Sequence, residues 1–379
     1  MKKVLRFFKK EWMLALSLAA AVAGLILTPM TAQRFLQIDW RTLGTLFMML
    51  CVLEGFKQEN VLQPLADLAL RLRHMTTLTL FLVFGVFFSS MFVTNDVSLM
   101  IFVPLTILLF RQIGQERYIL PVISMQNIAA VRGSLLTPFG SPQNLFLFGQ
   151  IDVSVGRFML RMLPLCVMSA ALLVVFVFVL YRKTRHSTVT PQAKSSPLPP
   201  ERRAQRVTYL VLFALVLAVI VTRTRLWPVA LAVVPAVILV IDRKLFLKVD
   251  YALLVTFLCF FIFSSSVAGN ETVAAFLRRS VAGREYWWAI GLSQIISNVP
   301  ATIVLFPFAV NRDALIYGAD TAGLCSLIGS LASVINYRIY VRAYPQNGGK
   351  FLRTFTLVSW AFFVIVVIPG YLLSRSRIF

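Results

Sequence analysis

The sequence predicts an all-α polytopic membrane protein with two inverted repeats and about 11 transmembrane segments, each repeat holding a re-entrant hairpin and a discontinuous helix. Three observations lead to this fold class. Hydrophobic residues make up 59% of the 379 residues, and charged residues only 14%. Apolar runs of about 17–25 residues, long enough to cross a bilayer, recur along the chain. Polar features interrupt these runs in the same order in both halves.

The formal net charge of +22 lies mostly in short loops between the apolar runs. In a soluble protein such a charge would suggest nucleic acid. Here it indicates orientation in a lipid bilayer, because helices sealed in lipid leave no extended basic groove. We therefore expect the bilayer as a partner and no nucleic acid.

Cysteine and histidine usage indicates no metal site. The four cysteines lie singly inside apolar runs, and both histidines lie beside basic loop residues. The chain also lacks Walker A, HExxH and hydrolase patterns. We therefore expect a protein that is not an enzyme, with no catalytic residues and no cofactor.

The first inverted repeat is expected at residues 1–181 and the second at residues 207–379, joined by a Pro/Ser-rich cytoplasmic linker at 182–206. The first repeat is predicted to contain scaffold spans within 12–56, a hairpin at 76–110 and a broken helix at 119–150. The second is predicted to contain scaffold spans within 207–268, a hairpin at 286–310, a broken helix at 320–343 and a last span at 354–373.

Both halves carry the same features in the same order. Each has an Asp-aromatic pair that opens an apolar run, then a more polar stretch, then a hydroxyl-Asn pair, then a Gly-Ser step. The matched pairs are Asp39-Trp40 with Asp250-Tyr251, Thr94-Asn95 with Ser297-Asn298, and Gly140-Ser141 with Gly329-Ser330. Such internal similarity is typical of transporters built from repeats.

Lysine positions predict the orientation. With a cytoplasmic N-terminus and two re-entrant hairpins, the inside loops are 1–10, 57–75, 111–118, 182–206, 243–249 and 338–353. Every lysine of the chain falls in these loops, as the positive-inside rule requires. An odd number of crossings then separates the repeats, so they are inverted, and the C-terminus is expected to be periplasmic.

The first predicted hairpin tip is Thr94-Asn95-Asp96-Val97-Ser98. Backbone N–H groups at the start of its second arm favour an anion, and Thr94 and Asn95 add neutral donors. An acid inside a membrane points to a functional site, so Asp96 is a candidate ligand for Na⁺ or a candidate carrier of a coupled proton. Alternatively, Asp96 only caps the second arm.

The second tip, Ser297-Asn298-Val299-Pro300-Ala301-Thr302, has the same design without an acid, with a proline near its first helical position. One tip can therefore hold an ion while the other mainly holds the substrate. The alternative is a Pro-broken turn between two spans.

Two broken helices complete the predicted site. The stretch from Gly133 to Asn144 contains two glycines and two prolines and cannot form regular helix. We interpret it as the break of a discontinuous helix, and the alternative is an extramembrane loop. Its free carbonyls can bind a cation, while its hydroxyl and amide side chains can bind oxyanions. Arg132, just before the break, can pair with a substrate carboxylate or with an internal acid such as Asp96. The second-half counterpart runs from Gly329 to Ser333.

We assign these polar residues to two roles. The predicted substrate-binding residues are Thr94, Asn95, Ser141, Gln143, Asn144, Ser297, Asn298, Thr302, Ser330 and Ser333. The predicted ion-coupling residues are Asp96, Asn95, Asn127, Thr137 and Gly140.

Thr94-Asn95-Asp96-Val97 with Pro104, the run from Leu136 to Asn144, and Ser297-Asn298-Val299-Pro300 resemble the ion transporter superfamily of citrate, dicarboxylate and arsenite permeases. The resemblance covers nearly the whole chain and is closest to YbiR-type anion permeases of bacterial inner membranes. It implies an elevator-like movement of a transport domain against a homodimeric scaffold. The sodium–dicarboxylate carriers have Ser-Asn-Thr where this chain reads Thr-Asn-Asp and Ser-Asn-Val, which leaves substrate and coupling ion open.

Together these features predict a secondary active transporter, a symporter of a small anion (a di- or tricarboxylate or an inorganic oxyanion) with Na⁺ or H⁺. The expected location is the bacterial inner membrane. Two alternatives are an arsenite or antimonite exporter and a Na⁺/H⁺ antiporter with Asp96 as the exchanging acid. A non-transporting scaffold is the poorest alternative, because polar breaks at mid-membrane are costly and a scaffold has no use for them.

Overall fold

The computed structural model describes residues 12–36, 38–61, 68–69, 72, 74–182 and 203–376. In these residues the regular elements are helices, which confirms the predicted all-α fold class. The first-half helices are α2 (Trp12–Leu27), α3 (Ala32–Leu36), α4 (Trp40–Gln58), α6 (Met75–Val93), α7 (Asn95–Gln112), η1 (Glu116–Tyr118), α8 (Ile119–Gly133), α9 (Pro142–Gln150) and α10 (Val155–Leu180). Residues 1–11, most of the predicted linker (183–202) and residues 377–379 lie outside the described part.

The second half begins with α11 (Arg203–Thr222), α12 (Trp227–Asp242), η3 (Arg243–Leu247), α13 (Tyr251–Ala268) and α14 (Glu271–Val281). It continues with α15 (Glu285–Ile296), α16 (Asn298–Leu305), η4 (Phe306–Phe308), α17 (Arg312–Ala322), α18 (Leu331–Ala343), η5 (Pro345–Asn347) and α19 (Gly348–Arg375). Among the described helices, six are long and apolar enough to cross a bilayer. The expected total of about 11 segments would also need the shorter helices, singly or in pairs.

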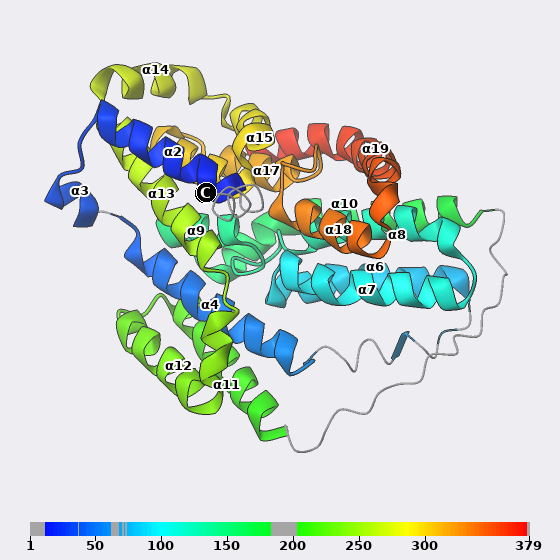
Figure 1. Cartoon of the computed structure of the whole chain (residues 1–379). Helices are drawn as coiled ribbons and strands as arrows, with labels where there is room; N and C mark the ends of the chain where they lie inside the picture. Colours follow the sequence, from blue (N-terminus) through cyan, green and yellow to red (C-terminus); the bar gives the residue numbers. More distant parts are fainter. Residues whose placement is uncertain are drawn as a thin grey trace.

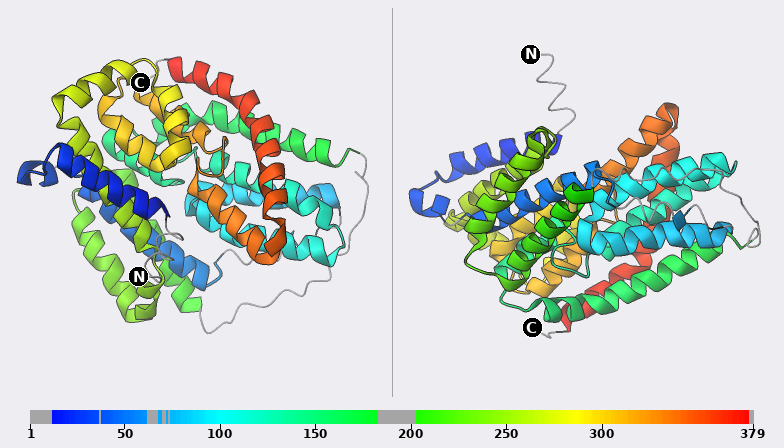
Figure 2. Two further views of the ribbon diagram at one scale, coloured as in Figure 1. Left: turned by 45° about the horizontal axis from the view of Figure 1, so that its top comes forward. Right: turned by 90° about the horizontal axis from the view of Figure 1, so that it is seen from below.

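The helices form two groups. In the first group α2 lies along α13, and α4 contacts α11 and α12, as seen at the left of Figure 1. In the second group α8 contacts α6, α7, α10 and α19, and α17 contacts α15 and α19 (Figure 2). The second group holds both hairpins and most of both broken helices.

Each hairpin packs against the broken helix of the other half. Helix α7 of the first hairpin contacts α18, and α16 of the second hairpin contacts α9. Pro307 ends α16 because it has no N–H to donate to the carbonyl of Ile303. The hydroxyl of Ser264 on α13 donates to that carbonyl at 3.0 Å, so the interruption of the helix also ties the second hairpin to the first helix group.

Polar contacts gather the loops at two ends of the molecule. At one end, which we call the lysine end, Lys248 Nζ donates to Gln58 at 3.1 Å. There Arg111 Nε also donates to the hydroxyl of Tyr344 at 2.8 Å. At the opposite end, Gln150 donates to Asp39 at 2.6 Å. These are the two sets of loops that the lysine pattern separates.

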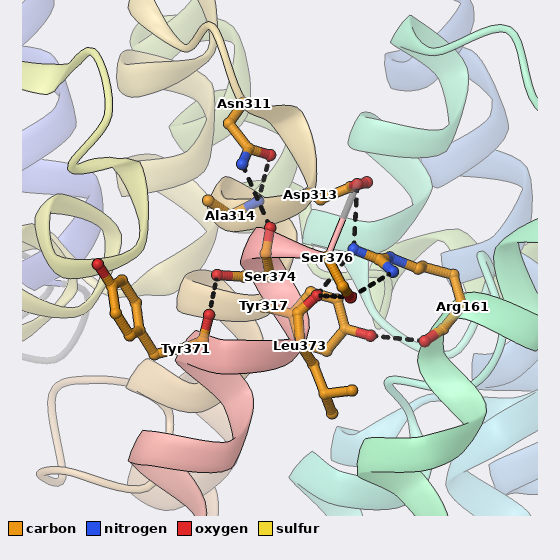
Figure 3. A network of polar contacts seen from close by, with 9 residues as sticks. All are labelled: Arg161, Asn311, Asp313, Ala314, Tyr317, Tyr371, Leu373, Ser374 and Ser376. Carbon is orange, nitrogen blue, oxygen red and sulfur yellow. Dashed lines mark hydrogen bonds and ion pairs between the residues drawn. The ribbon is translucent and has the colours of Figure 1, made fainter. Parts of the chain in front are cut away.

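Figure 3 shows a second cluster at the opposite end, around the buried Arg161 of α10. Its guanidinium lies 3.3 Å from the Asp313 carboxylate and donates to the carbonyl of Leu373 at 2.8 Å. The hydroxyl of Tyr317 donates to the carbonyl of Arg161 at 2.5 Å. The cluster therefore holds the start of α17 against α10 and α19.

The second broken helix begins earlier than expected. Its first arm, α17, starts at Arg312 rather than at residue 320, and α19 starts at Gly348 rather than at residue 354. The first turn of α17 is polar, because Asn311 caps it and Asp313 pairs with Arg161. Polar turns of this kind fall outside an apolar run, which is why hydropathy misses them.

Candidate functional site

The first hairpin tip is a sharp break at Thr94. Helix α6 ends at Val93, α7 begins at Asn95, and Thr94 between them has φ 70° and ψ 157°. The side chain of Asn95 is buried, and its oxygen accepts the backbone N–H of Asp96 at 3.0 Å. The hydroxyl of Ser98 donates to the carbonyl of Thr94 at 2.9 Å, which closes the first turn of α7.

The second tip repeats this backbone at Ser297, with φ 68° and ψ 158°. Here the surroundings differ, since the backbone N–H of Asn298 donates to the carbonyl of Gly329 at 3.2 Å. The side chain of Asn298 also donates to the carbonyl of Ala319 at 3.4 Å. The hydroxyl of Thr302 donates to the carbonyl of Asn298 at 2.7 Å, so it serves its own helix.

Matched backbone angles recur at two other predicted repeat positions. The helix caps Asp39 and Asp250 have φ −75° and −77°, with ψ 75° and 78°. The caps that follow the two breaks, Ser141 and Ser330, have φ −146° and −148°. Asp39 lies at the end opposite the lysine end, whereas Asp250 follows Lys248, so the two halves are inverted copies.

The first break, between α8 and α9, is held against the first hairpin. The hydroxyl of Thr137 donates to the carbonyl of Met91. A Cβ at Gly133 would lie 2.0 Å from the carbonyl oxygen of Phe87, so only glycine permits this close approach. Gly140 has the same role inside the break, where a Cβ would lie 2.5 Å from the carbonyl oxygen of Ser134.

Two contacts join the halves between α8 and α18. The amide of Asn127 donates to the hydroxyl of Ser333 at 3.0 Å. The amide of Asn336 donates to the carbonyl of Ile123 at 2.7 Å. All three side chains are fully buried. The predicted ion-coupling residue Asn127 and the predicted substrate residue Ser333 are thus neighbours.

A buried acid that sequence reasoning did not single out lies at the centre. Asp320, near the end of α17, is 1% exposed. The amide of Gln143 donates to its carboxylate at 3.2 Å. Arg132, 0% exposed, donates from Nη1 to the main-chain carbonyl of Asp320 at 3.1 Å and from Nε to the hydroxyl of Ser169 at 3.0 Å.

Asp320 could have been found from the sequence. It lies nine residues before Gly329, much as Arg132 lies eight residues before Gly140 in the first half. An acid inside an apolar segment is a site candidate by default. The sequence left two partners open for Arg132, a substrate carboxylate or an internal acid such as Asp96. In the structure its guanidinium donates to the main-chain carbonyl of the internal acid Asp320 and to the hydroxyl of Ser169.

Two cavities lie in corresponding places of the two halves. A cavity of about 590 Å³ at the lysine end is lined by Thr94 and Asp96 of the first tip and by Glu54, Lys57, Lys248 and Asp250, among others. A cavity of about 330 Å³ at the opposite end is lined by Asp39, Ser265, Ile303 and Phe306, among others. The first cavity reaches a hairpin tip, whereas the second touches only the arm of the other hairpin.

The predicted site residues therefore fall into four neighbourhoods. Thr94 and Asp96 face the larger cavity, and Gln143 approaches Asp320. Asn127 contacts Ser333, and Asn298 is tied to the second break. Within the described residues no hydrogen bond joins the two tips, and no group of three or more His, Cys, Asp or Glu side chains is placed to hold a metal. One oxygen of Asp96 is buried without a hydrogen-bond partner among the described residues.

Comparisons with known proteins point to membrane transport. Residues 4–314 match the model of the CitMHS family, described as a citrate transporter. The chain is 30% identical over 343 residues to the inner membrane protein YbiR of Escherichia coli K12, covering 89% of this chain and 88% of that protein. It is 26% identical over 355 residues to an uncharacterized transporter of Methanocaldococcus jannaschii, covering 93% of each.

A solved structure shares the fold. The crystal structure of the Alcanivorax borkumensis YdaH transporter, described as having an unusual topology, superposes with a TM-score of 0.52 over 96% of each chain. The two sequences are 15% identical, so this likeness concerns the fold alone.

Proposed function

We propose, from the premise that this chain belongs to the CitMHS citrate transporter family, that it is a secondary active transporter of a small anion. The substrate class is a di- or tricarboxylate or an inorganic oxyanion, moved by symport with Na⁺ or H⁺. The protein acts in the bacterial inner membrane, with the lysine end toward the cytoplasm, as the positive-inside rule favours.

The observation that carries this proposal is the pair of tips at Thr94 and Ser297. Each begins a helix at a buried Asn, and a helix N-terminus favours negative charge. A break in the helical backbone is costly inside a membrane unless it serves a site. Broken helices paired in two inverted repeats support the same function.

The larger cavity, at the lysine end, supports an alternating-access mechanism. It reaches Thr94 and Asp96, so in this structure the first tip is accessible from that end. An elevator-like step would carry the hairpins and broken helices against a scaffold of α2, α4 and α11–α13. The family resemblance adds a homodimer formed through that scaffold.

Thermal stability of the purified protein tests the proposal. Citrate, succinate, phosphate, sulfate and arsenite are added with and without Na⁺ at two pH values, because a ligand that binds only the folded state raises Tm. We expect one of these anions to stabilise the wild type and to lose this effect in Asn95→Ala and in Asn298→Ala. Asn311→Ala removes a half-buried helix cap far from both tips and should leave the anion effect intact.

A Na⁺/H⁺ antiporter is the second candidate, favoured by the three carboxylates Glu54, Asp96 and Asp250 around the larger cavity. In that case only Na⁺ or pH shifts Tm, and Asp96→Asn removes the shift while changes at the second tip are tolerated. That outcome would replace anion transport by cation exchange. A Tm that rises with arsenite alone would instead favour a metalloid exporter.

A further inference from the structure

Asp320 lies where the two halves meet. The groups that approach it come from the first half, with Gln143 on α9 and Arg132 on α8, while Asp320 itself is on α17 of the second half. Gln143 and Asn144 are two of the four amide residues that the sequence assigns to the substrate. In this structure Gln143 donates instead to a carboxylate of the protein itself.

The amide of Asn144 has two good orientations, and they suit different states of Asp320. With its nitrogen toward the acid, Asn144 donates to both carboxylate oxygens, at 3.3 and 3.2 Å. Turned over, its nitrogen donates to the carbonyls of Ser134 and Leu135 in the break, at 3.5 and 3.4 Å. A carboxylate only accepts hydrogen bonds, so it favours the first orientation. A protonated acid can donate to the amide oxygen, so it favours the second.

Arg132 leaves one donor unused beside this acid. Its Nη2 is buried and has no hydrogen-bond partner among the described residues, although Nε and Nη1 are both satisfied. A buried charged donor without a partner is costly, and an anion is the group that would satisfy it. The unused donor and the amide of Gln143 thus make a pair of donors suited to a carboxylate or an oxyanion.

Few other titratable groups face Asp320. Tyr286 of α15 donates to the carbonyl of Val367 at 2.8 Å, and Tyr317 of α17 donates to the carbonyl of Arg161. Cys166 of α10 lies near Arg132, and the Asp313–Arg161 pair is held at the far end of α17. Helices α9 and α16 carry no titratable side chain. Arg132 is therefore the one charge within the described residues that faces Asp320 directly.

We propose that Asp320 is the proton-binding residue of this carrier and that, as an internal carboxylate, it competes with the transported anion for the amide of Gln143 and for the positive charge of Arg132. This inference rests on the proposed function and assigns its coupling ion. Uptake of a proton neutralises Asp320, and Asn144 turns toward the carbonyls of the break. Gln143 and Arg132 Nη2 are then available to the anion, so one proton accompanies each anion bound.

The test measures anion affinity against pH in full-length protein in nanodiscs, without Na⁺. Sulfate and succinate are the probes, because both remain dianions between about pH 6.5 and about pH 8.5, so any pH dependence belongs to the protein. In the wild type the apparent Kd should weaken about tenfold per pH unit above the pKa of the acid, because only the protonated fraction binds. In Asp320→Asn the apparent Kd should be as tight as in the low-pH wild type and independent of pH.

Asp313→Asn is the matched control, since Asp313 is a buried acid on the same helix but belongs to the cluster around Arg161. It should retain the wild-type pH dependence even if it lowers Tm. Should Asp320→Asn not fold, Asp320→Glu keeps an acid and moves it relative to Gln143, so the midpoint of the pH dependence must shift.

The outcomes separate the two proposals. Wild-type pH dependence in Asp320→Asn, or an unmoved midpoint in Asp320→Glu, overturns the inference while anion transport stands. Loss of pH dependence in Asp96→Asn with its retention in Asp320→Asn assigns the proton to Asp96 and also overturns it. If neither these probes nor citrate and phosphate bind the wild type at any pH, anion transport itself fails, and the inference with it.

Discussion

Compared with the tip at Ser297, which is tied to the break of its own half, the tip at Thr94 lies on the wall of a cavity. The two tips have nearly the same backbone angles, so the difference is in what surrounds them. Asn298 donates to the carbonyls of Gly329 and Ala319, whereas the side chain of Asn95 accepts the backbone N–H of the next residue, Asp96. One chain design, used twice, thus produces one open and one closed tip.

The caps of the scaffold helices show the same inequality. Asp39, at the end opposite the lysine end, accepts hydrogen bonds from the amide of Gln150 at 2.6 Å and from the hydroxyl of Thr42. Asp250, at the lysine end, is exposed and accepts a hydrogen bond from the backbone N–H of Leu253 at 3.0 Å. We expect transport to exchange these arrangements, with Asp39 released when the second tip opens. The difference between equivalent positions then reports the state of the carrier.

The largest expected effect is on chemical accessibility of the two tips. Thr94→Cys should react with a membrane-impermeant maleimide added at the lysine end at least about tenfold faster than Ser297→Cys does from either end, because a buried thiol is inert. The four native cysteines are buried and give little background. Equal labelling of both positions would show that the tips do not differ in access.

The next effect concerns Arg132 and Asp320, two residues of opposite charge that precede the breaks of the first and second halves. Arg132→Met removes the hydrogen bonds to Ser169 and Asp320 and leaves a buried carboxylate without its neighbouring charge, which should lower the free energy of unfolding by about 3–5 kcal/mol. Asp320→Asn in the same chain should restore about 0.5–3 kcal/mol of that loss. Denaturation of the single and double variants measures both values, and strict additivity would show that the two charges are independent.

The sequence predicted more of the fold than of the candidate site. Apolar runs and repeated polar steps predicted the helices and both breaks, because hydropathy follows directly from composition. It missed Asp320 and could not say which internal acid Arg132 would meet, because which buried groups meet depends on how the two halves pack together. It also gave no sign that Gln143 would be occupied by a carboxylate of the protein. Local signals fix where helices break, while packing decides which of those breaks stays accessible.

The smallest effect tests whether the two tips share their backbone strain. Thr94 and Ser297 have φ near +70°, a region that costs a residue other than glycine about 1–3 kcal/mol. Glycine relieves this strain but loses about 0.5–1 kcal/mol through the entropy of the unfolded chain. Thr94→Gly should therefore be about 1 kcal/mol more stable than Thr94→Ala in thermal denaturation, and Ser297 should behave alike. Ser141 and Ser330, with φ −146° and −148°, are the controls, and there alanine should be the more stable replacement. If alanine were the more stable replacement at one of the two tips, the tips would not share their backbone strain. The open and closed tips would then differ in backbone conformation as well as in surroundings.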